Sequence, residues 1–321
     1  MDRKWWKESI VYQIYPSSFQ DSDGDGIGDL NGIRSRLDYL KDLGVNVLWL
    51  CPIMDSPMDD NGYDISNYRA INPRFGTMED FDALLAEAHQ RGIRIVMDLV
   101  VNHTSDEHPW FIESRKSKDN PYHDYYIWRP GKTVRGKRRP PNNWTSMFEG
   151  GAWEYDEGLD EYYLHVFAKK QPDLNMDNPK VREEVKRIMQ FWLDMGVDGF
   201  REDVITFISK TEGLPDSHPW LPAANGYKYY SNGPRVHQYL MEFKRDVLDC
   251  YDCFTVGESP LTTADIALQY VTEGPDQVLD EMIAFSHMEA DCFMIDMVQL
   301  PFNLVKMKRA FSDWQYKLAG R

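Results

Sequence analysis

One pattern recurs three times along this chain: an amphipathic helix, a glycine that ends it, and a short apolar strand. In the clearest copy, Thr77 caps a helix whose apolar residues keep helical spacing as far as Gly92, and a strand follows over 93–101. Strands that alternate with helices of this length predict parallel βαβ units. With the remaining apolar segments, the sequence predicts an α/β fold with six candidate strands: 10–15, 45–50, 93–101, 197–205, 254–257 and 282–285.

The segment between the third and fourth candidate strands interrupts this pattern. Residues 102–171 carry clusters of Trp, Tyr and charged side chains without helical periodicity. A stretch of that length inside a compact domain is either disordered or an excursion with a function. Its many aromatic residues favour an ordered subdomain.

The charge and hydropathy of the chain exclude two classes of partner. Lys and Arg number 36 against 52 Asp and Glu, a net charge of -16, so binding to a nucleic-acid backbone is not expected. No apolar run approaches the roughly 20 residues of a membrane span. A small neutral substrate is therefore favoured. The charged segment Met1–Tyr12 has no secretory apolar core, which predicts a cytoplasmic protein.

Polar residues stand where three of the predicted strands end. Asp98 belongs to the third strand, Arg201 and Asp203 to the fourth, and Glu258 follows the fifth. In parallel barrels the active site lies at this end of the strands. Any one of these residues alone also fits a solvated loop charge or a structural hydrogen bond, but their joint occurrence favours a site. Two carboxylates of unequal pKa are what glycosidic cleavage needs.

Asp203 and Glu258 are expected to differ in protonation. Alternation along a strand places Asp203 on the same side as Arg201, whose charge would keep that carboxylate ionised. Glu258 has no basic neighbour in its own segment, so an apolar setting would raise its pKa. The sequence thus predicts one ionised carboxylate and one proton donor.

An acidic loop near the start of the chain is typical of calcium binding. Five residues at alternate positions offer oxygen ligands, and a glycine permits the sharp turn. They are Asp21, Asp23, Asp25, Ile27 through its backbone carbonyl, and Asp29. The twelfth position is Gly32 rather than Glu, so a freestanding EF-hand is not expected. A structural calcium ion is the predicted cofactor, and an acidic turn without a metal is the alternative.

Six short blocks, in order, resemble the signature sequences of the α-amylase family of glycoside hydrolases. The similarity is closest to the oligo-1,6-glucosidase and α-glucosidase subgroup, for which the fourth block is characteristic. The blocks cover nearly the whole chain: residues 13–16 with Phe19, 62–64, 98–103, 171–175, 199–203 and 256–258.

This resemblance implies a (β/α)8 TIM-type barrel with a small domain inserted after strand three. The chain would divide into strands one to three over 1–103, the inserted subdomain over 104–176, and strands four to six over 177–321. About six of the eight strands are then present, and the chain ends before strand seven. A missing C-terminal segment or a second chain would complete the barrel.

The same resemblance implies a retaining, exo-acting α-glucoside hydrolase that acts on small oligosaccharides and needs no organic cofactor. Asp203 would be the nucleophile that forms a covalent glucosyl intermediate, and Glu258 the acid/base. The subgroup also holds calcium at a loop like 21–29. The implied substrate-binding residues are Tyr63, Asp64, His103, Phe167, Arg201 and Val204, of which Val204 resembles enzymes that prefer α-1,6 over α-1,4 linkages.

Two features depart from the family pattern. The third essential carboxylate of the family, in a His-Asp block after strand seven, has no match before Arg321, and His287 near the end of the sixth strand is not a substitute. Glu202 stands where an apolar residue is usual. Alternation predicts that its side chain points away from Asp203 and that the change is tolerated.

Two other functions fit the sequence as well. A trehalose-6-phosphate hydrolase is a close sibling, but it would need basic groups for the phosphate, and the run Lys132–Arg139 is the only candidate. The second is a truncated inactive product or a sugar-binding relative without catalysis.

Overall fold

The computed structural model describes residues 4–148, 150–219, 221, 224–293 and 298–319. Its main sheet has six strands that are all parallel and are paired in chain order. These strands are β1 (Val11–Ile14), β2 (Val47–Leu50), β5 (Arg94–Leu99), β11 (Gly199–Glu202), β12 (Phe254–Glu258) and β13 (Glu281–Ile283). Each overlaps a segment predicted from the sequence, which confirms the α/β fold.

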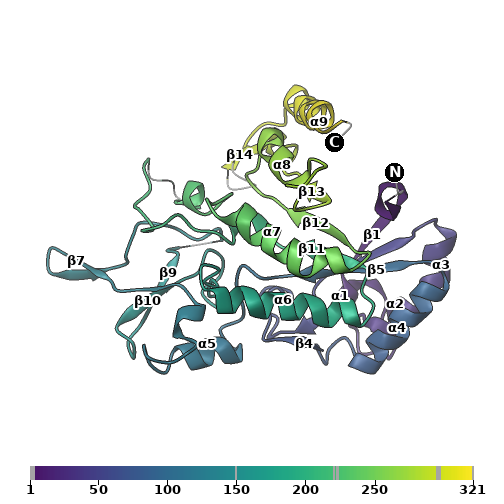
Figure 1. Ribbon diagram of the computed structural model, residues 1–321, viewed down its shortest axis with the longest axis horizontal. Coiled ribbons are helices and arrows are strands. Elements are labelled where there is room, and N and C mark those ends of the chain that lie inside the picture. The colour runs from purple at the N-terminus through teal and green to yellow at the C-terminus, as the bar shows by residue number, and fades with distance from the viewer. Residues whose placement is uncertain (1–3, 149, 220, 222–223, 294–297, 320–321) are drawn as a thin grey trace.

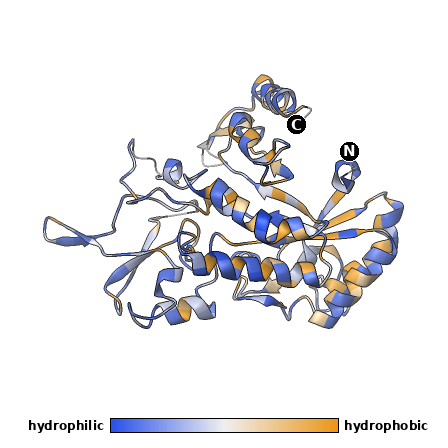
Figure 2. Cartoon of the chain, in the orientation of Figure 1, coloured by the Kyte–Doolittle hydropathy of each residue, from blue (hydrophilic) through white to orange (hydrophobic). Residues whose placement is uncertain are grey.

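Helices follow the strands and cover the sheet. Figure 1 shows α6 (Pro179–Asp194) and α7 (Val236–Asp246) side by side across the strands. Figure 2 shows hydrophobic residues on the strands and largely hydrophilic outer faces on these two helices. The other helices are α1 (Pro16–Phe19), α2 (Leu30–Ser35), α3 (Leu37–Asp42), α4 (Met78–Gln90), α5 (Pro109–Ser114), α8 (Ala264–Val271) and α9 (Leu304–Leu318), with 3-10 turns at Trp5–Glu8, His123–Tyr125, Ile205–Phe207, Tyr227–Tyr229, Leu248–Cys250 and Met288–Ala290.

The predicted start of α4 is confirmed in its hydrogen bonds. Thr77 Oγ1 accepts a bond from the Asp80 backbone N–H at 3.2 Å, and Asp80 Oδ2 accepts one from the Thr77 N–H at 2.9 Å. This reciprocal capping box satisfies two backbone donors that have no partner inside the helix. The helix therefore begins where the sequence pattern places it.

The amino-terminal ends of the strands are covered by two tryptophans. Trp5 and Trp6 pack against Phe254 at the start of β12, with ring centroids 5.9 and 5.7 Å apart. Val47, Val96 and Val256 also belong to this small apolar cluster. These tryptophans do not cover the carboxyl ends of the strands, where a site can form.

The segment 104–176 forms an ordered structure beside the carboxyl ends of the strands (Figure 1). It contributes aromatic residues to a second hydrophobic cluster that also includes Phe207 and Tyr230, which follow β11. The segment is therefore packed onto the loop that follows the fourth barrel strand. Its strands are β6 (Trp128–Arg129), β7 (Lys132–Val134), β8 (Lys137–Arg139), β9 (Trp153–Asp156) and β10 (Glu161–Leu164), arranged as a sheet β6-β10-β9 and a hairpin β7-β8; short pairs β3 (Met54–Asp55) with β4 (Asn67–Ile71) and β14 (Cys292–Phe293) with β15 (Val298–Gln299) lie elsewhere.

The main sheet is open at both edges. In the part of the chain that the structure describes, β1 pairs only with β2, and β13 pairs only with β12. The architecture is thus an incomplete barrel of six parallel strands. None of the described helices combines the length and apolarity that crossing a bilayer requires.

Candidate active site

Four charged residues meet at the carboxyl ends of β5, β11 and β12. Arg201 Nη1 lies 2.6 Å from Asp98 Oδ1 and 2.6 Å from Asp203 Oδ1. Its other terminal nitrogen, Nη2, lies 2.6 Å from Glu258 Oε2. These three carboxylates and the guanidinium are called the carboxylate cluster below. Asp98, Arg201 and Asp203 are buried, and the side chain of Glu258 is 15% exposed. The structure therefore brings together the residues that the strand ends predicted.

Strand register explains this convergence. Arg201 of β11 is paired with Asp98 of β5 on one side and with Val256 of β12 on the other. Residues paired directly in a parallel sheet share a face, and residues two apart on one strand do so as well. Asp203 and Glu258 each lie two residues beyond this row, so their carboxylates reach the same guanidinium.

Val204 contributes to the site through its backbone. Its φ of +35° is in the left-handed region, which is costly for a β-branched residue. In this conformation its N–H donates a hydrogen bond to Glu258 Oε2 at 3.1 Å. The Val204 side chain is buried in the second hydrophobic cluster, which also contains Phe167.

The cluster raises the pKa of its proton donor. Burial, and then the charge of Asp203, raise the pKa of Glu258, and Arg201 opposes the shift. Burial likewise raises the pKa of Asp98 to about 6. Glu258 has no basic neighbour in its own segment, but it contacts the Arg201 guanidinium, which lies 57 residues away in the sequence. Burial nevertheless outweighs the arginine, so Glu258 can hold a proton near neutral pH.

Of the predicted substrate-binding residues, Tyr63 contacts the carboxylate cluster, and His103 and Phe167 contact each other. The Tyr63 ring lies over the Arg201 guanidinium at 5.6 Å. His103 and Phe167 form a second group, with ring centroids 5.2 Å apart. The position of His103 is fixed by Gln171, whose Nε2 lies 3.2 Å from His103 Nε2.

The carboxylate of Asp64 is bonded within its own loop. Its side chain is fully buried, and its oxygens accept bonds from Ser56 Oγ at 2.9 Å and from the Asp59 and Asp60 N–H groups at 2.9 and 3.0 Å. These bonds hold the loop 56–64 together. Asp60, which sequence reasoning missed, accepts a bond from Gln171 at 2.8 Å and interacts electrostatically with His103 and Asp203.

Two further polar contacts were also missed. Trp49 Nε1 donates to Asp98 Oδ2 at 2.9 Å, which fixes the carboxylate that shares Arg201. Lys210 is buried and bridges Asp173 at 2.7 Å and Asn102 at 2.8 Å. This ammonium ties the inserted segment to the end of β5. Only the three-dimensional approach of distant segments reveals either contact.

Glu202 points away from the carboxylate cluster, as alternation predicts. Its side chain is 1% exposed, and Oε2 has no hydrogen-bond partner among the described residues. Burial, with a smaller contribution from Asp280, raises the pKa of Glu202 to about 8. Glu202 in place of the family's usual apolar residue is therefore not neutral for stability, because the buried site disfavours the charge of its carboxyl group.

Replacing Glu202 by Gln is expected to raise the free energy of unfolding by about 2 kcal/mol at pH 8. A folded-state pKa above the ordinary value means that stability is lost as pH rises towards 8, and Gln removes this ionisation. The gain should be small at pH 5. Urea denaturation at both pH values measures it, with exposed Glu212→Gln as control, and an equal gain at the two pH values would contradict the prediction.

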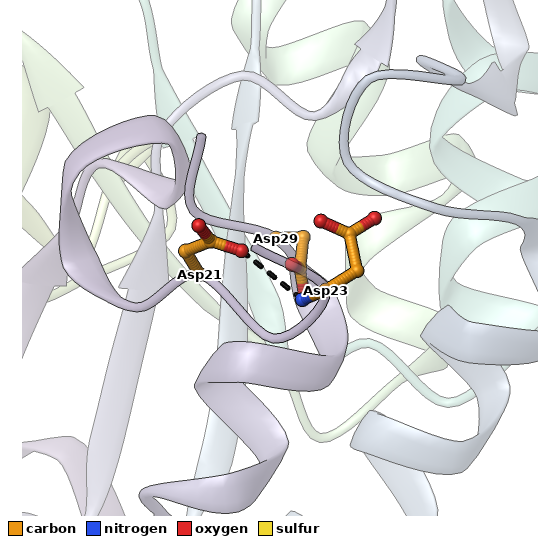
Figure 3. A group of neighbouring side chains, drawn as sticks. All are labelled: Asp21, Asp23 and Asp29. Atoms are coloured by element: carbon orange, nitrogen blue, oxygen red, sulfur yellow. Dashed lines mark hydrogen bonds between the residues drawn. The ribbon is translucent and has the colours of Figure 1, made fainter. Parts of the chain in front are cut away.

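The acidic loop brings three of its five predicted ligands together. Carboxylate oxygens of Asp21, Asp23 and Asp29 lie within 4.8 Å of one another (Figure 3). Asp21 also accepts bonds from the N–H groups of residues 23, 24 and 26, which curl the loop around it. Asp25 Oδ1 instead accepts a bond from Ile27 N–H at 2.7 Å and does not join the group. A set of hard oxygen donors at this spacing fits a calcium ion.

The basic run 132–139 forms the hairpin β7-β8. Lys132 pairs with Asp216 at 3.2 Å and Arg138 with Asp160 at 2.7 Å. Within the described residues, no side chain of this hairpin makes a hydrogen bond or ion pair with the carboxylate cluster. Its position therefore gives no support to phosphate binding beside Asp203.

Comparison with known proteins identifies the family. The model of the alpha amylase catalytic domain matches residues 13–321. The chain is 58% identical to an oligo-1,6-glucosidase of Parageobacillus thermoglucosidasius over all of this chain and 57% of that protein. It is 49% identical to a trehalose-6-phosphate hydrolase of Bacillus subtilis (strain 168) over 97% of this chain and 54% of that protein.

Solved structures agree with this assignment. A crystal structure of Bacillus licheniformis trehalose-6-phosphate hydrolase matches with a TM-score of 0.92 and 46% identity over 98% of this chain and 56% of that one. The trehalulose synthase from Pseudomonas mesoacidophila MX-45 matches with a TM-score of 0.91 and 43% identity over 100% and 56%. The chain thus spans slightly more than half the length of these relatives. It belongs to the alpha-amylase family of glycoside hydrolases, and its six parallel strands form part of the family's TIM barrel.

Proposed function

We propose that this chain carries the catalytic carboxylates of a retaining, exo-acting α-glucosidase that releases glucose from short α-1,6-linked oligosaccharides. The observation that carries the proposal is the pair Asp203 and Glu258 on one buried guanidinium. Burial keeps a proton on Glu258, while Arg201 neutralises and orients Asp203. One nucleophile and one proton donor at close range are the two groups that a retaining mechanism needs.

The reaction proceeds in two displacements. In the first, Asp203 attacks the anomeric carbon, the bond to the leaving oxygen breaks, and Glu258 gives its proton to that oxygen. In the second, water gives a proton to Glu258 and attacks the same carbon, which frees Asp203 and glucose. Two inversions restore the original configuration.

The anomer released first tests this mechanism. Proton NMR during hydrolysis of an aryl α-glucoside, whose only sugar product is the released glucose, is expected to show α-glucose before mutarotation. The Glu258→Gln variant serves as the negative control because it lacks the proton donor. Release of β-glucose as the first product would contradict the covalent intermediate.

A neutral leaving group is favoured over a phosphorylated one. Several relatives are named oligo-1,6-glucosidase, and trehalose-6-phosphate hydrolases are also similar. A phosphate needs cationic partners. In the described part of the chain, Arg201 is the only cation bonded to the carboxylate cluster, and its two terminal nitrogens already contact three carboxyl groups.

We also propose that the acidic loop binds a structural calcium ion through Asp21, Asp23, Asp25, Ile27 and Asp29. The grouping of three of these carboxylates supports the proposal, since neighbouring negative charges repel one another without a cation. Asp25 would have to release its bond to Ile27 N–H to take part.

Removal of calcium is expected to lower the melting temperature by several degrees. A ligand at 100 times its dissociation constant stabilises the folded state by about 2.7 kcal/mol. Differential scanning calorimetry with excess chelator, followed by addition of CaCl2, measures the effect. Asp21→Asn should abolish the response to both additions. An unchanged melting curve in protein that contains no metal would remove the proposal.

A further inference from the structure

Four Asn-Gly pairs occur in this chain, and asparagine followed by glycine is the dipeptide most prone to lose its side-chain amide. The reason is steric, because glycine has no Cβ to shield the backbone nitrogen that attacks the preceding side chain. The pairs begin at Asn31, Asn61, Asn225 and Asn232. The sequence does not separate them, but their surroundings in the structure differ.

Three of the four asparagines are held by their side chains. The Asn31 side chain donates one hydrogen bond and accepts another, both at 2.8 Å. Asn225 is fully buried and donates to the Asn143 carbonyl at 2.6 Å. The Asn232 side chain accepts a bond from the Tyr270 hydroxyl at 2.9 Å. Each of these side chains must break hydrogen bonds before it can react.

Asn61 differs from the other three. It is exposed, and within the part of the chain that the structure describes its side chain makes no hydrogen bond. The N–H of Gly62, the group that would attack, has no hydrogen-bond partner there either. No hydrogen bond therefore has to break before the two groups meet.

The backbone of the loop 56–64 explains why this pair stands at an exposed position. Asn61 and Gly62 have φ values of +50° and +101°, which Asn and Gly tolerate best. They form the tip of a tight turn, closed by a hydrogen bond from the Tyr63 N–H to the Asp60 carbonyl at 2.9 Å. The turn thus requires the same two residues that make it chemically labile.

We infer that Asn61 is a site of spontaneous deamidation whose main product disrupts this turn. The Gly62 backbone nitrogen attacks Asn61 Cγ and a C–N bond forms. The proton of that nitrogen ends on the departing amide group, which leaves as ammonia. Water then opens the cyclic succinimide at one of its two C–N bonds. One opening gives aspartate, and the other gives isoaspartate, in which the main chain runs through the side-chain carbon.

Isoaspartate adds one carbon atom to the main chain inside the closed turn. The bond from the Tyr63 N–H to the Asp60 carbonyl spans this point, so it cannot keep its geometry. The Tyr63 ring lies over Arg201 at 5.6 Å, and the Asp60 carboxyl accepts a bond from Gln171 at 2.8 Å. The longer turn therefore displaces two side chains beside the carboxylate cluster.

Peptide mapping of protein incubated at pH 6 and pH 8 tests the modification. The fragment with Asn61 is expected to gain the mass of an amide-to-acid change at least about tenfold faster than fragments with the other three pairs. The gain should be faster at pH 8, because the attacking nitrogen must lose its proton. An isoaspartate-specific methyltransferase identifies the product. Asn61→Gly, which suits the same positive φ and carries no amide, is the matched control.

Two further measurements follow the turn. In protein with isoaspartate at position 61, the Tyr63 N–H is expected to exchange with deuterium about tenfold faster, because its bond to Asp60 is lost. Turnover of an aryl α-glucoside, in a polypeptide that also supplies the family's third essential carboxylate, should fall in proportion to the modified fraction. This turnover measurement alone rests on the proposed function. Asn61→Gly should show neither change after the same incubation.

The outcomes separate this inference from the proposed function. Absence of modification at Asn61, or equal modification of all four pairs, would overturn the inferred site. Unchanged exchange at Tyr63 in modified protein would overturn the effect on the turn. A starting protein without turnover would contradict the proposed function, while the mass and exchange measurements would still decide this inference.

Discussion

Replacing Asp203 by Asn is expected to reduce turnover of an aryl α-glucoside by at least about 10⁴-fold, because no covalent glucosyl intermediate can form. The substitution preserves shape, and the Asn side-chain oxygen can still accept the bond from Arg201 that Asp203 accepts at 2.6 Å. The melting temperature should therefore change little. Initial rates with and without the substitution, in a polypeptide that also supplies the family's third essential carboxylate, measure the loss.

Azide provides a positive readout for the same variant. In Asp203→Asn, an azide ion can occupy the place of the missing carboxylate and attack the anomeric carbon as Glu258 protonates the leaving group. The expected product is β-glucosyl azide, formed with a single inversion. Asp160→Asn, at a side chain 68% exposed, is the control that should keep full activity. Full turnover by Asp203→Asn without azide would exclude Asp203 as the nucleophile.

Replacing Arg201 by Met is expected to lower the free energy of unfolding by about 3 to 5 kcal/mol at pH 7. The change leaves Asp98, Asp203 and Glu258 buried without their common counter-ion. Lowering the pH protonates carboxylates and removes the uncompensated charge, so the deficit should shrink at pH 5. Urea denaturation at pH 5 and pH 7 measures both effects.

A surface arginine is the matched control for this substitution. Arg187 is 55% exposed and pairs with Glu184 at 2.7 Å on the same helix. Exposed pairs contribute about 0 to 1 kcal/mol, so Arg187→Met should alter stability little at either pH. A loss in Arg201→Met no larger than in Arg187→Met would show that the carboxylate cluster does not depend on the guanidinium.

Local periodicity was sufficient to predict the strands and their functional ends. The capping pattern at Thr77 and the glycine stops depend on residues close in sequence, and the structure confirms the helix start. The common side of Arg201 and Asp203 follows from alternation along one strand. Both depend only on short-range geometry, which is why the sequence revealed them.

Contacts that depend on turns or on distant strands could not be predicted from local sequence patterns. Asn61 and Gly62 both have left-handed backbone conformations, which reverse the chain so that Asp64 caps its own loop while Asp60 reaches Gln171. The contact between Arg201 and Glu258 depends on the register between β11 and β12. No pattern within either segment determines that register.

The shared guanidinium has a consequence for the timing of proton transfer. Burial and the negative charge of Asp203 both raise the pKa of Glu258. When Asp203 becomes an ester, that negative charge disappears while Arg201 stays in place, so the pKa of Glu258 falls. The same side chain then favours its ionised form just as a base for water is needed. In the proposed mechanism, the covalent step itself would thus switch Glu258 from acid to base, and the change would reverse when the ester is hydrolysed.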